Sequence, residues 1–150
     1  EIRNKVTMKN NAKYIVASII LMAVFTCGSM IAQVKQGKTR PLKTAQLMKG
    51  VMKPNCTQLK KGLDAGPDSD KAWAELAMNA ALINEISYTL MADGRCPDGT
   101  WAKAANGTLR ECSSAILKAV NSKNVQEAKK AFSAMTKACS ACHDVHKKKK

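Results

Sequence analysis

The side chains best suited to chemistry lie together near the end of this 150-residue sequence. The run Cys139-Ser140-Ala141-Cys142-His143 holds two thiols three positions apart, with an imidazole directly after the second thiol. On a helix these positions share one side, so the thiols and the imidazole would point in the same direction. Two thiols at this spacing can bond the vinyl groups along one haem edge, and the imidazole can then reach the iron. The run therefore predicts a covalently attached c-type haem, held by Cys139 and Cys142, with His143 as the proximal ligand.

Three other interpretations of the same residues were weighed. Together with His146, the run offers thiolates and imidazoles to zinc, although a closed tetrahedral site usually draws its ligands from two elements. The C-x-x-C spacing also occurs in thioredoxin-like redox pairs, but no βαβ pattern surrounds it here. A plain disulfide between Cys139 and Cys142 is the simplest alternative. Haem attachment is favoured, because it takes place outside the cytoplasm in bacteria and the chain carries an export signal.

The export signal lies within residues 1–32, which are interpreted as an N-terminal extension followed by a signal peptide. Lys9 and Lys13 precede an apolar run over residues 15–25, and small residues follow it at Gly28, Ser29 and Ala32. An apolar run of about 11 residues is short for crossing roughly 30 Å of hydrocarbon. Cleavage after Ala32 is expected, and an uncleaved anchor is the alternative. The prediction is a periplasmic protein without a membrane attachment, unless the signal is retained.

Charge then narrows the choice of partner. The sequence has 25 Lys+Arg and 11 Asp+Glu, a formal charge of +14. Removal of residues 1–32 leaves 21 basic and 10 acidic residues, or +11. Since an exported protein rarely meets nucleic acid, nucleic acid is not expected as a partner. The basic surface is expected to steer the protein toward a redox protein with an acidic patch.

Four helical segments are predicted to position these residues. Residues 33–40 form a linker, and residues 41–150 form the domain, with a basic tail. Helices are expected over residues 41–63, 69–91, 100–120 and from 125 to the tail, with short turns between them. Pro54 should bend or break the first helix near Lys53, and Gly107 weakens the prediction for the start of the third. The fold class is an all-α, antiparallel up-down-up-down four-helix bundle with covalently bound haem. The first helix presents an inward apolar stripe of Ala45, Met48, Met52, Cys56, Leu59 and Leu63.

The C-terminal motif and the four predicted helices together resemble a known family. The ending Ala138-Cys139-Ser140-Ala141-Cys142-His143-Asp144 is similar to that of class II c-type cytochromes, the cytochrome c prime group. The resemblance covers residues 41–147 and is specific mainly in the haem motif. It implies a haem between the helices near the start of the first helix, and a mono-haem protein that transfers single electrons and is not an enzyme. It also allows a homodimer, as in some relatives.

The family divides according to what occupies the other face of the iron. Low-spin members place a methionine there, within a stretch that residues 43–49 resemble, and this points to Met48 as the distal ligand. Met48 also lies on the inward stripe, and Met52, one turn further along, is its competitor. A methionine at this spacing is commonly core filler, in which case the iron face stays open. The alternative function is therefore a five-coordinate, cytochrome c prime-like protein that binds small gases such as NO and CO.

Three further cysteines of the mature chain have no assigned role. Cys56, Cys96 and Cys112 are an odd set, so at most one disulfide can form among them. Cys56 and Cys112 are expected at similar heights in the bundle, whereas Cys112 lies about 18 Å along its helix from the loop that holds Cys96. The pairing is left open.

Overall fold

The computed structural model describes residues 38–147, and this part of the chain is built from four helices with no strand. The all-helical prediction is therefore confirmed. The predicted extension and signal peptide over residues 1–32, residues 33–37 of the predicted linker and residues 148–150 of the predicted basic tail lie outside the described residues. Among the described residues, no helix combines the length and the apolar character that a membrane span requires.

The first helix is continuous but changes its winding twice. It consists of α2 (Thr44–Leu47), the π-helical segment η1 (Met48–Met52) and α3 (Lys53–Ala65). Lys43 is its N-cap, so the predicted start at residue 41 was three residues early. Pro54 does not break the helix. It lies directly after the π-helical segment, where the Lys53 N–H donates to the Met48 carbonyl oxygen, so the helix accommodates the proline by a local change of winding.

The remaining helices follow the predicted order. The second helix is α4 (Asp70–Met91), and the fourth is α7 (Val125–His146). The third is again composite, with α5 (Gly99–Ala102), the π-helical segment η2 (Lys103–Arg110) and α6 (Glu111–Asn121). The stretch around Gly107, where the sequence predicted a helix only weakly, is thus helical with π winding.

Side chains fix the starts of three helices. A hydroxyl, carboxylate or amide oxygen at the N-cap accepts a hydrogen bond from a free backbone N–H of the first turn. The N–H to oxygen distances are 3.2 Å from Ala72 to Ser69, 2.9 Å from Trp101 to Asp98, and 3.1 Å from Glu127 to Asn124. These caps explain why the predicted and observed starts of the second, third and fourth helices differ by no more than one residue.

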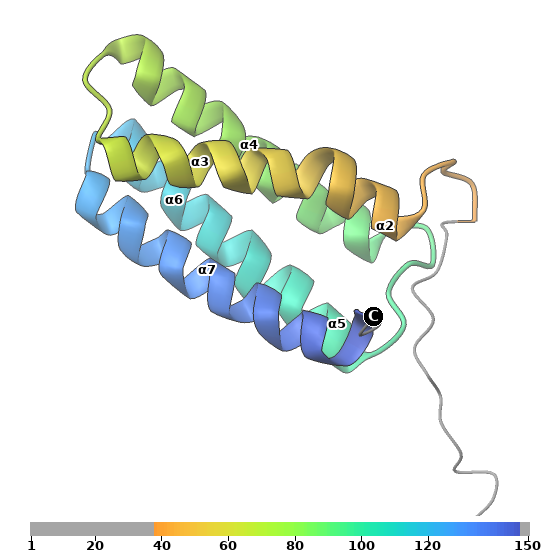
Figure 1. The fold of residues 1–150 in the computed structure, drawn as a ribbon. Helices are drawn as coiled ribbons and strands as arrows, with labels where there is room; N and C mark the ends of the chain where they lie inside the picture. The colour runs from red at the N-terminus through yellow and green to blue at the C-terminus, as the bar shows by residue number, and fades with distance from the viewer. Residues whose placement is uncertain (1–37, 148–150) are drawn as a thin grey trace, which may run out of the picture. The chain divides into compact units, whose positions relative to one another are not determined.

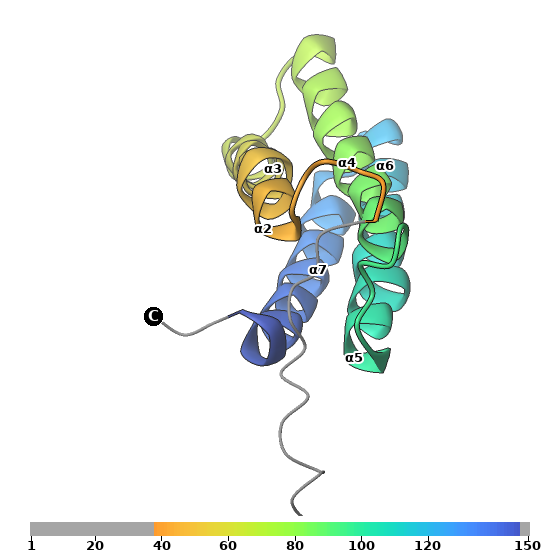
Figure 2. The same cartoon turned by 90° about the vertical axis from the view of Figure 1, so that its right-hand side faces the viewer.

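The helices lie side by side, and their connections alternate between two ends (Figure 1). The 66–69 and 122–124 connections lie at one end, while the 92–98 loop lies at the other, beside α2, α5 and the end of α7 (Figures 1 and 2). α4 packs against α3 and α6, and α7 packs against α6 and η2. α3 also touches α7.

A continuous apolar core joins the four helices. Leu59, Ile83, Ile116 and Met135, one from each helix, are fully buried. Of the predicted first-helix stripe, Met52, Leu59 and Leu63 are buried, and Met48 and Cys56 are half-buried against the core. Ala45 is exposed, contrary to the prediction, because the π-helical segment between Ala45 and the buried Leu59 and Leu63 shifts the register that the regular 3–4 spacing assumed.

Candidate haem site

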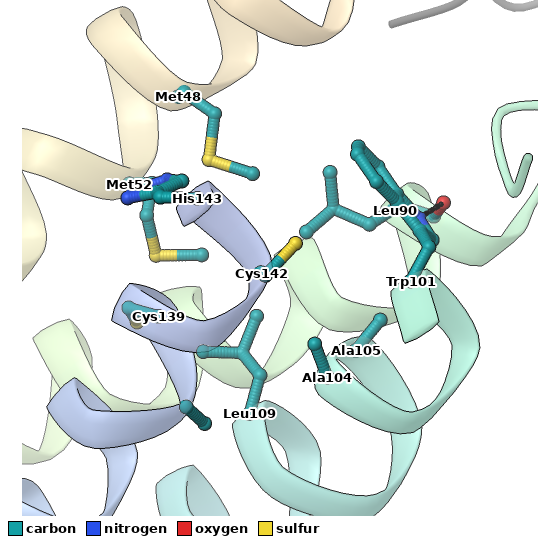
Figure 3. Close-up of a pocket in the computed structure, with 11 residues that line it drawn as sticks. Met48, Met52, Leu90, Trp101, Ala104, Ala105, Leu109, Cys139, Cys142 and His143 are labelled. Carbon is teal, nitrogen blue, oxygen red and sulfur yellow. Dashed lines mark hydrogen bonds between the residues drawn. The ribbon is translucent and has the colours of Figure 1, made fainter. Parts of the chain in front are cut away.

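An apolar pocket lies at the end of the bundle that carries the 92–98 loop (Figure 3). It contains about 460 Å³ of space free of protein atoms, part of which is open to solvent. All four helices contribute to its lining, which consists of Met48, Met52, Leu90, Trp101, Ala104, Ala105, Leu109, Ala138, Cys139, Cys142 and His143. The structure thus brings together every residue that the sequence selected for the site: the two motif thiols, the imidazole and both candidate methionines.

Both π-helical segments border this pocket. η1 contributes Met48 and Met52, and η2 contributes Ala104, Ala105 and Leu109. The wider π-helical turn changes which side chains face a neighbouring helix, and such segments occur frequently at functional sites. The predicted 3–4 spacing assumed regular α-helix and did not detect them.

The fourth helix supplies the C-x-x-C-H wall of the pocket. Cys139 and Cys142 are half-buried, and both thiols are free. Burial is the main cause that raises the pKa of each thiol, so both are protonated near neutral pH. The pKa of His143 is lowered, first by burial and then by Lys147, with Asp144 acting in the opposite direction. This wall therefore presents two neutral thiols and an imidazole whose neutral form, the form that binds metals, is favoured.

The first helix supplies the opposite wall. In Figure 3 the side chains of Met48 and Met52 extend from it toward the space beside Cys142 and Leu109. The two thioethers differ in their surroundings. The Cys56 thiol lies 3.7 Å from the Met52 sulfur and donates to it, while no hydrogen bond reaches the Met48 sulfur from residues 38–147. Met48 is the more exposed of the two.

Trp101 closes one side of the pocket and is itself held in place. Its indole N–H donates to the Leu90 carbonyl oxygen at 2.9 Å, and the His146 ring meets it edge-on, with the ring centroids 5.3 Å apart. The buried His146 ring places Nε2 3.4 Å from a carboxylate oxygen of Asp98. His146 thus belongs to the packing around Trp101 and is not among the residues that line the pocket.

The zinc interpretation needs His146 beside the motif. Among the described residues, no three or more His, Cys, Asp or Glu side chains form a group that could hold a metal ion. The arrangement therefore gives the zinc alternative no support.

The 92–98 loop fastens the start of the first helix. The Asp93 carboxylate accepts from the backbone N–H groups of Thr39 and Arg40 at 3.0 Å each, and from the Thr39 hydroxyl at 2.8 Å. These bonds, with the Arg40 N–H as the largest contribution, lower the pKa of Asp93. The buried Arg95 donates from Nη2 to the Leu42 carbonyl oxygen at 3.0 Å. The loop thus sets the position of the helix that carries both methionines.

The other cysteines lie near the site without pairing. All five cysteines within residues 38–147 have free thiols, so the structure has no disulfide between Cys56 and Cys112. Burial, reinforced by the neighbouring Cys139, raises the pKa of Cys56 to about 11. The Cys96 thiol donates to the Asp98 carbonyl oxygen at 3.4 Å. These thiols behave as small apolar side chains with weak donors.

Sequence reasoning missed several lining residues. Leu90, Trp101, Ala104, Ala105, Leu109 and Ala138 line the pocket but were not among the site residues selected from the sequence. One signal was available, because Ala138 directly precedes Cys139 and its small side chain leaves space beside the motif.

Comparison with known proteins identifies no relative. No protein family, curated protein or solved structure matches the chain.

Proposed function

We propose that this chain is a mono-haem c-type cytochrome that transfers single electrons between redox partners in the periplasm. In this proposal the four helices form an antiparallel up-down-up-down bundle, and Cys139 and Cys142 hold the haem through thioether bonds. His143 is the proximal ligand, and Met48 is the distal ligand. The observation that carries the proposal is the meeting of both motif thiols, His143 and two methionines in one apolar pocket.

The residues of the pocket fit a haem bound in this way. Both thiols are free and lie on the same wall as the imidazole, so that one cofactor edge can meet both sulfurs. Each thiol would add its S–H across one vinyl C=C bond, forming an S–C bond and leaving its hydrogen on the neighbouring carbon. This addition needs no oxidant. The apolar lining from Leu90, Trp101 and Leu109 would cover the porphyrin faces and keep water from the iron.

The bound group would supply a reversible one-electron change at its iron. The protein's part is to keep the ligands fixed in both oxidation states. The lowered pKa of His143 favours the neutral imidazole that coordinates iron. Met48, as a second protein ligand to the bound group, would raise its reduction potential. Met48 is preferred to Met52 because the Met52 sulfur already accepts a hydrogen bond from Cys56.

The first test is the mass of the denatured protein after co-expression with a c-type haem attachment system. We expect one covalently bound haem per chain, with the protein recovered from the periplasm. A chain without covalent haem would exclude the proposed function.

The visible spectrum then separates electron transfer from gas binding. A methionine–iron charge-transfer band in the ferric protein supports a six-coordinate electron carrier. A high-spin spectrum, with a ferrous form that shifts readily on addition of carbon monoxide, would favour the five-coordinate gas-binding alternative.

A further inference from the structure

The net charge of the described residues is confined to one end of the bundle. The pocket end is defined as residues 38–53, 90–110 and 137–147, which include every lining residue of the pocket. It contains ten Lys+Arg and three Asp+Glu, a net charge of +7. The remote half, residues 54–89 and 111–136, contains seven of each and is neutral overall. The basic composition of residues 38–147 is therefore a property of the pocket end alone.

Four lysines of the pocket end directly adjoin the pocket lining. Each is the sequence neighbour of a lining residue, and together they come from the first, third and fourth helices. Because each lysine directly precedes or follows a lining residue along its helix, each lies beside the pocket lining, at what we call the rim of the pocket. All four are exposed, and none forms an ion pair with another described residue. These rim lysines are Lys49, Lys53, Lys103 and Lys137.

The same end also exposes apolar side chains. Leu42 is 43% exposed and Val145 is 59% exposed, and Val145 lies two residues after His143. Exposed apolar side chains at an end where basic residues outnumber acidic ones suit a weak encounter interface, in which charge steers the approach and little surface is buried. Within the ranges that define the pocket end, the large aromatic side chain Trp101 is buried, and the half-exposed Tyr88 just outside them lies against the Arg110 guanidinium.

We propose that the pocket end is the docking face for a redox protein that presents carboxylates around its own electron-transfer site. The rim lysines pair with these carboxylates, while Leu42 and Val145 contact the apolar area between them. This assignment rests on the proposed function, because electrons would enter and leave through the pocket. It goes further in placing the interface at one end and leaving the neutral remote half uninvolved.

The test compares two variants of equal net charge, both made as haem-loaded full chains. One changes the rim lysines, K49Q/K53Q/K103Q/K137Q. The control changes four exposed lysines of the remote half that form no ion pair with other described residues, K61Q/K71Q/K118Q/K130Q. The probe is a reduced, acidic plant-type ferredoxin, and stopped-flow absorbance measures haem reduction over a series of ionic strengths. A neutral hydroquinone serves as a reductant that charge does not steer.

At low ionic strength we expect the rim variant to lose about tenfold or more in the second-order rate constant with ferredoxin, together with most of its salt dependence. The control variant should stay within about twofold of the wild type, and the hydroquinone rate should be unchanged in both. Equal losses in the two variants would mean that only overall charge matters and would overturn the proposed face, as would unchanged rates in both.

Two further measurements keep the alternatives apart. Co-sedimentation with vesicles of zwitterionic and anionic lipid tests a membrane role. Vesicle binding that depends on the rim lysines, combined with unchanged ferredoxin rates, would overturn the protein-docking proposal in favour of a lipid surface. Covalent haem is measured by mass in every variant. Its absence from the wild type would refute the proposed function, whereas haem-loaded variants with equal ferredoxin rates would refute only the docking face.

Discussion

The two ends of this bundle differ in winding, packing and charge. In the remote half the helices are regular, Leu59, Ile83 and Ile116 have no exposed surface, and acidic and basic residues balance. At the pocket end two helices adopt π winding, the motif residues are half-buried or exposed, and the net charge is +7. The comparison suggests that the remote half supplies most of the stability of the fold. The fold can then tolerate, at the pocket end, a pocket that the protein does not fill and an excess of positive charge.

The largest effect is expected from the motif thiols of the pocket end. The double substitution C139A/C142A should abolish covalent haem attachment, because within residues 38–147 these are the only thiols that line the pocket. The matched control is C96A/C112A, which also removes two free thiols but none that lines the pocket. Mass spectrometry of the denatured proteins should find haem on the control alone. Haem retained by C139A/C142A would contradict the assignment.

The next largest effect concerns the distal methionine. M48A should convert a low-spin ferric spectrum into a high-spin one, because the thioether ligand is lost. M52A should leave the spectrum low-spin, since its sulfur is engaged by Cys56. Absorbance of the ferric proteins at neutral pH measures both. If M52A rather than M48A became high-spin, the ligand assignment would pass to Met52.

The difference in packing predicts unequal losses of stability. I116A, in the remote half, should lower the free energy of unfolding of the haem-free protein by about 2–5 kcal/mol, because it leaves a closed cavity. L109A should fall at the low end of that ~2–5 kcal/mol range, since it only enlarges a pocket that already exists. Urea titration followed by circular dichroism measures both. A larger loss of unfolding free energy for L109A than for I116A would contradict the inference that the remote half supplies most of the stability.

The smallest effect lies in a surface ion pair of the remote half. Lys123 Nζ lies 2.7 Å from an Asp70 carboxylate oxygen, and a hydrogen bond from Lys123 is the main cause that lowers the pKa of Asp70. A lowered carboxyl pKa means that the pair stabilises the fold above the unfolded-state pKa, and that this is lost as the pH falls through the folded-state value. D70N should therefore be slightly less stable than the wild type at pH 7.

A double-mutant cycle of D70N with K123Q, measured by urea unfolding at pH 7 and at pH 2.5, isolates the pair. The coupling should be small at pH 7, weaker at high salt, and smaller at pH 2.5 than at pH 7, because lowering the pH shifts Asp70 toward its neutral form. A coupling of equal size at both pH values would show that the residues interact by some means other than charge.

The helices were predictable because their signals are local. Ser69, Asp98 and Asn124 are N-caps whose own oxygens bind the first turn, and a sequence window of a few residues contains that information. The start of the first helix was misplaced because Pro41 is suited to a first turn, whereas the contact of Arg95 with the Leu42 carbonyl holds residue 42 outside the helix. That contact joins residues 53 positions apart, and local propensity cannot register it.

The residues of the candidate site also fall into two groups, those that local spacing identifies and those that only long-range packing identifies. The motif thiols and His143 were identified from spacing along one helix. The opposite wall required knowledge of which turn of the first helix faces α7, and the π winding of η1 changes that register. The sequence could not show that His146 stays outside the pocket. Only the tertiary structure shows that its ring packs against Trp101 and lies beside Asp98, although His146 follows His143 by three residues.

The sequence by itself determined the helical class, three of the four helix starts to within one residue, and the cluster of thiols and imidazole on one helical side. These properties follow from periodicity, capping and short spacing, all of which act within a few residues. Only the tertiary structure decided that two methionines face this cluster across an apolar pocket, that two π-helical segments border it, and that the net charge of the described residues lies at the pocket end. Those properties depend on how helices from distant parts of the chain pack together, which no single segment specifies.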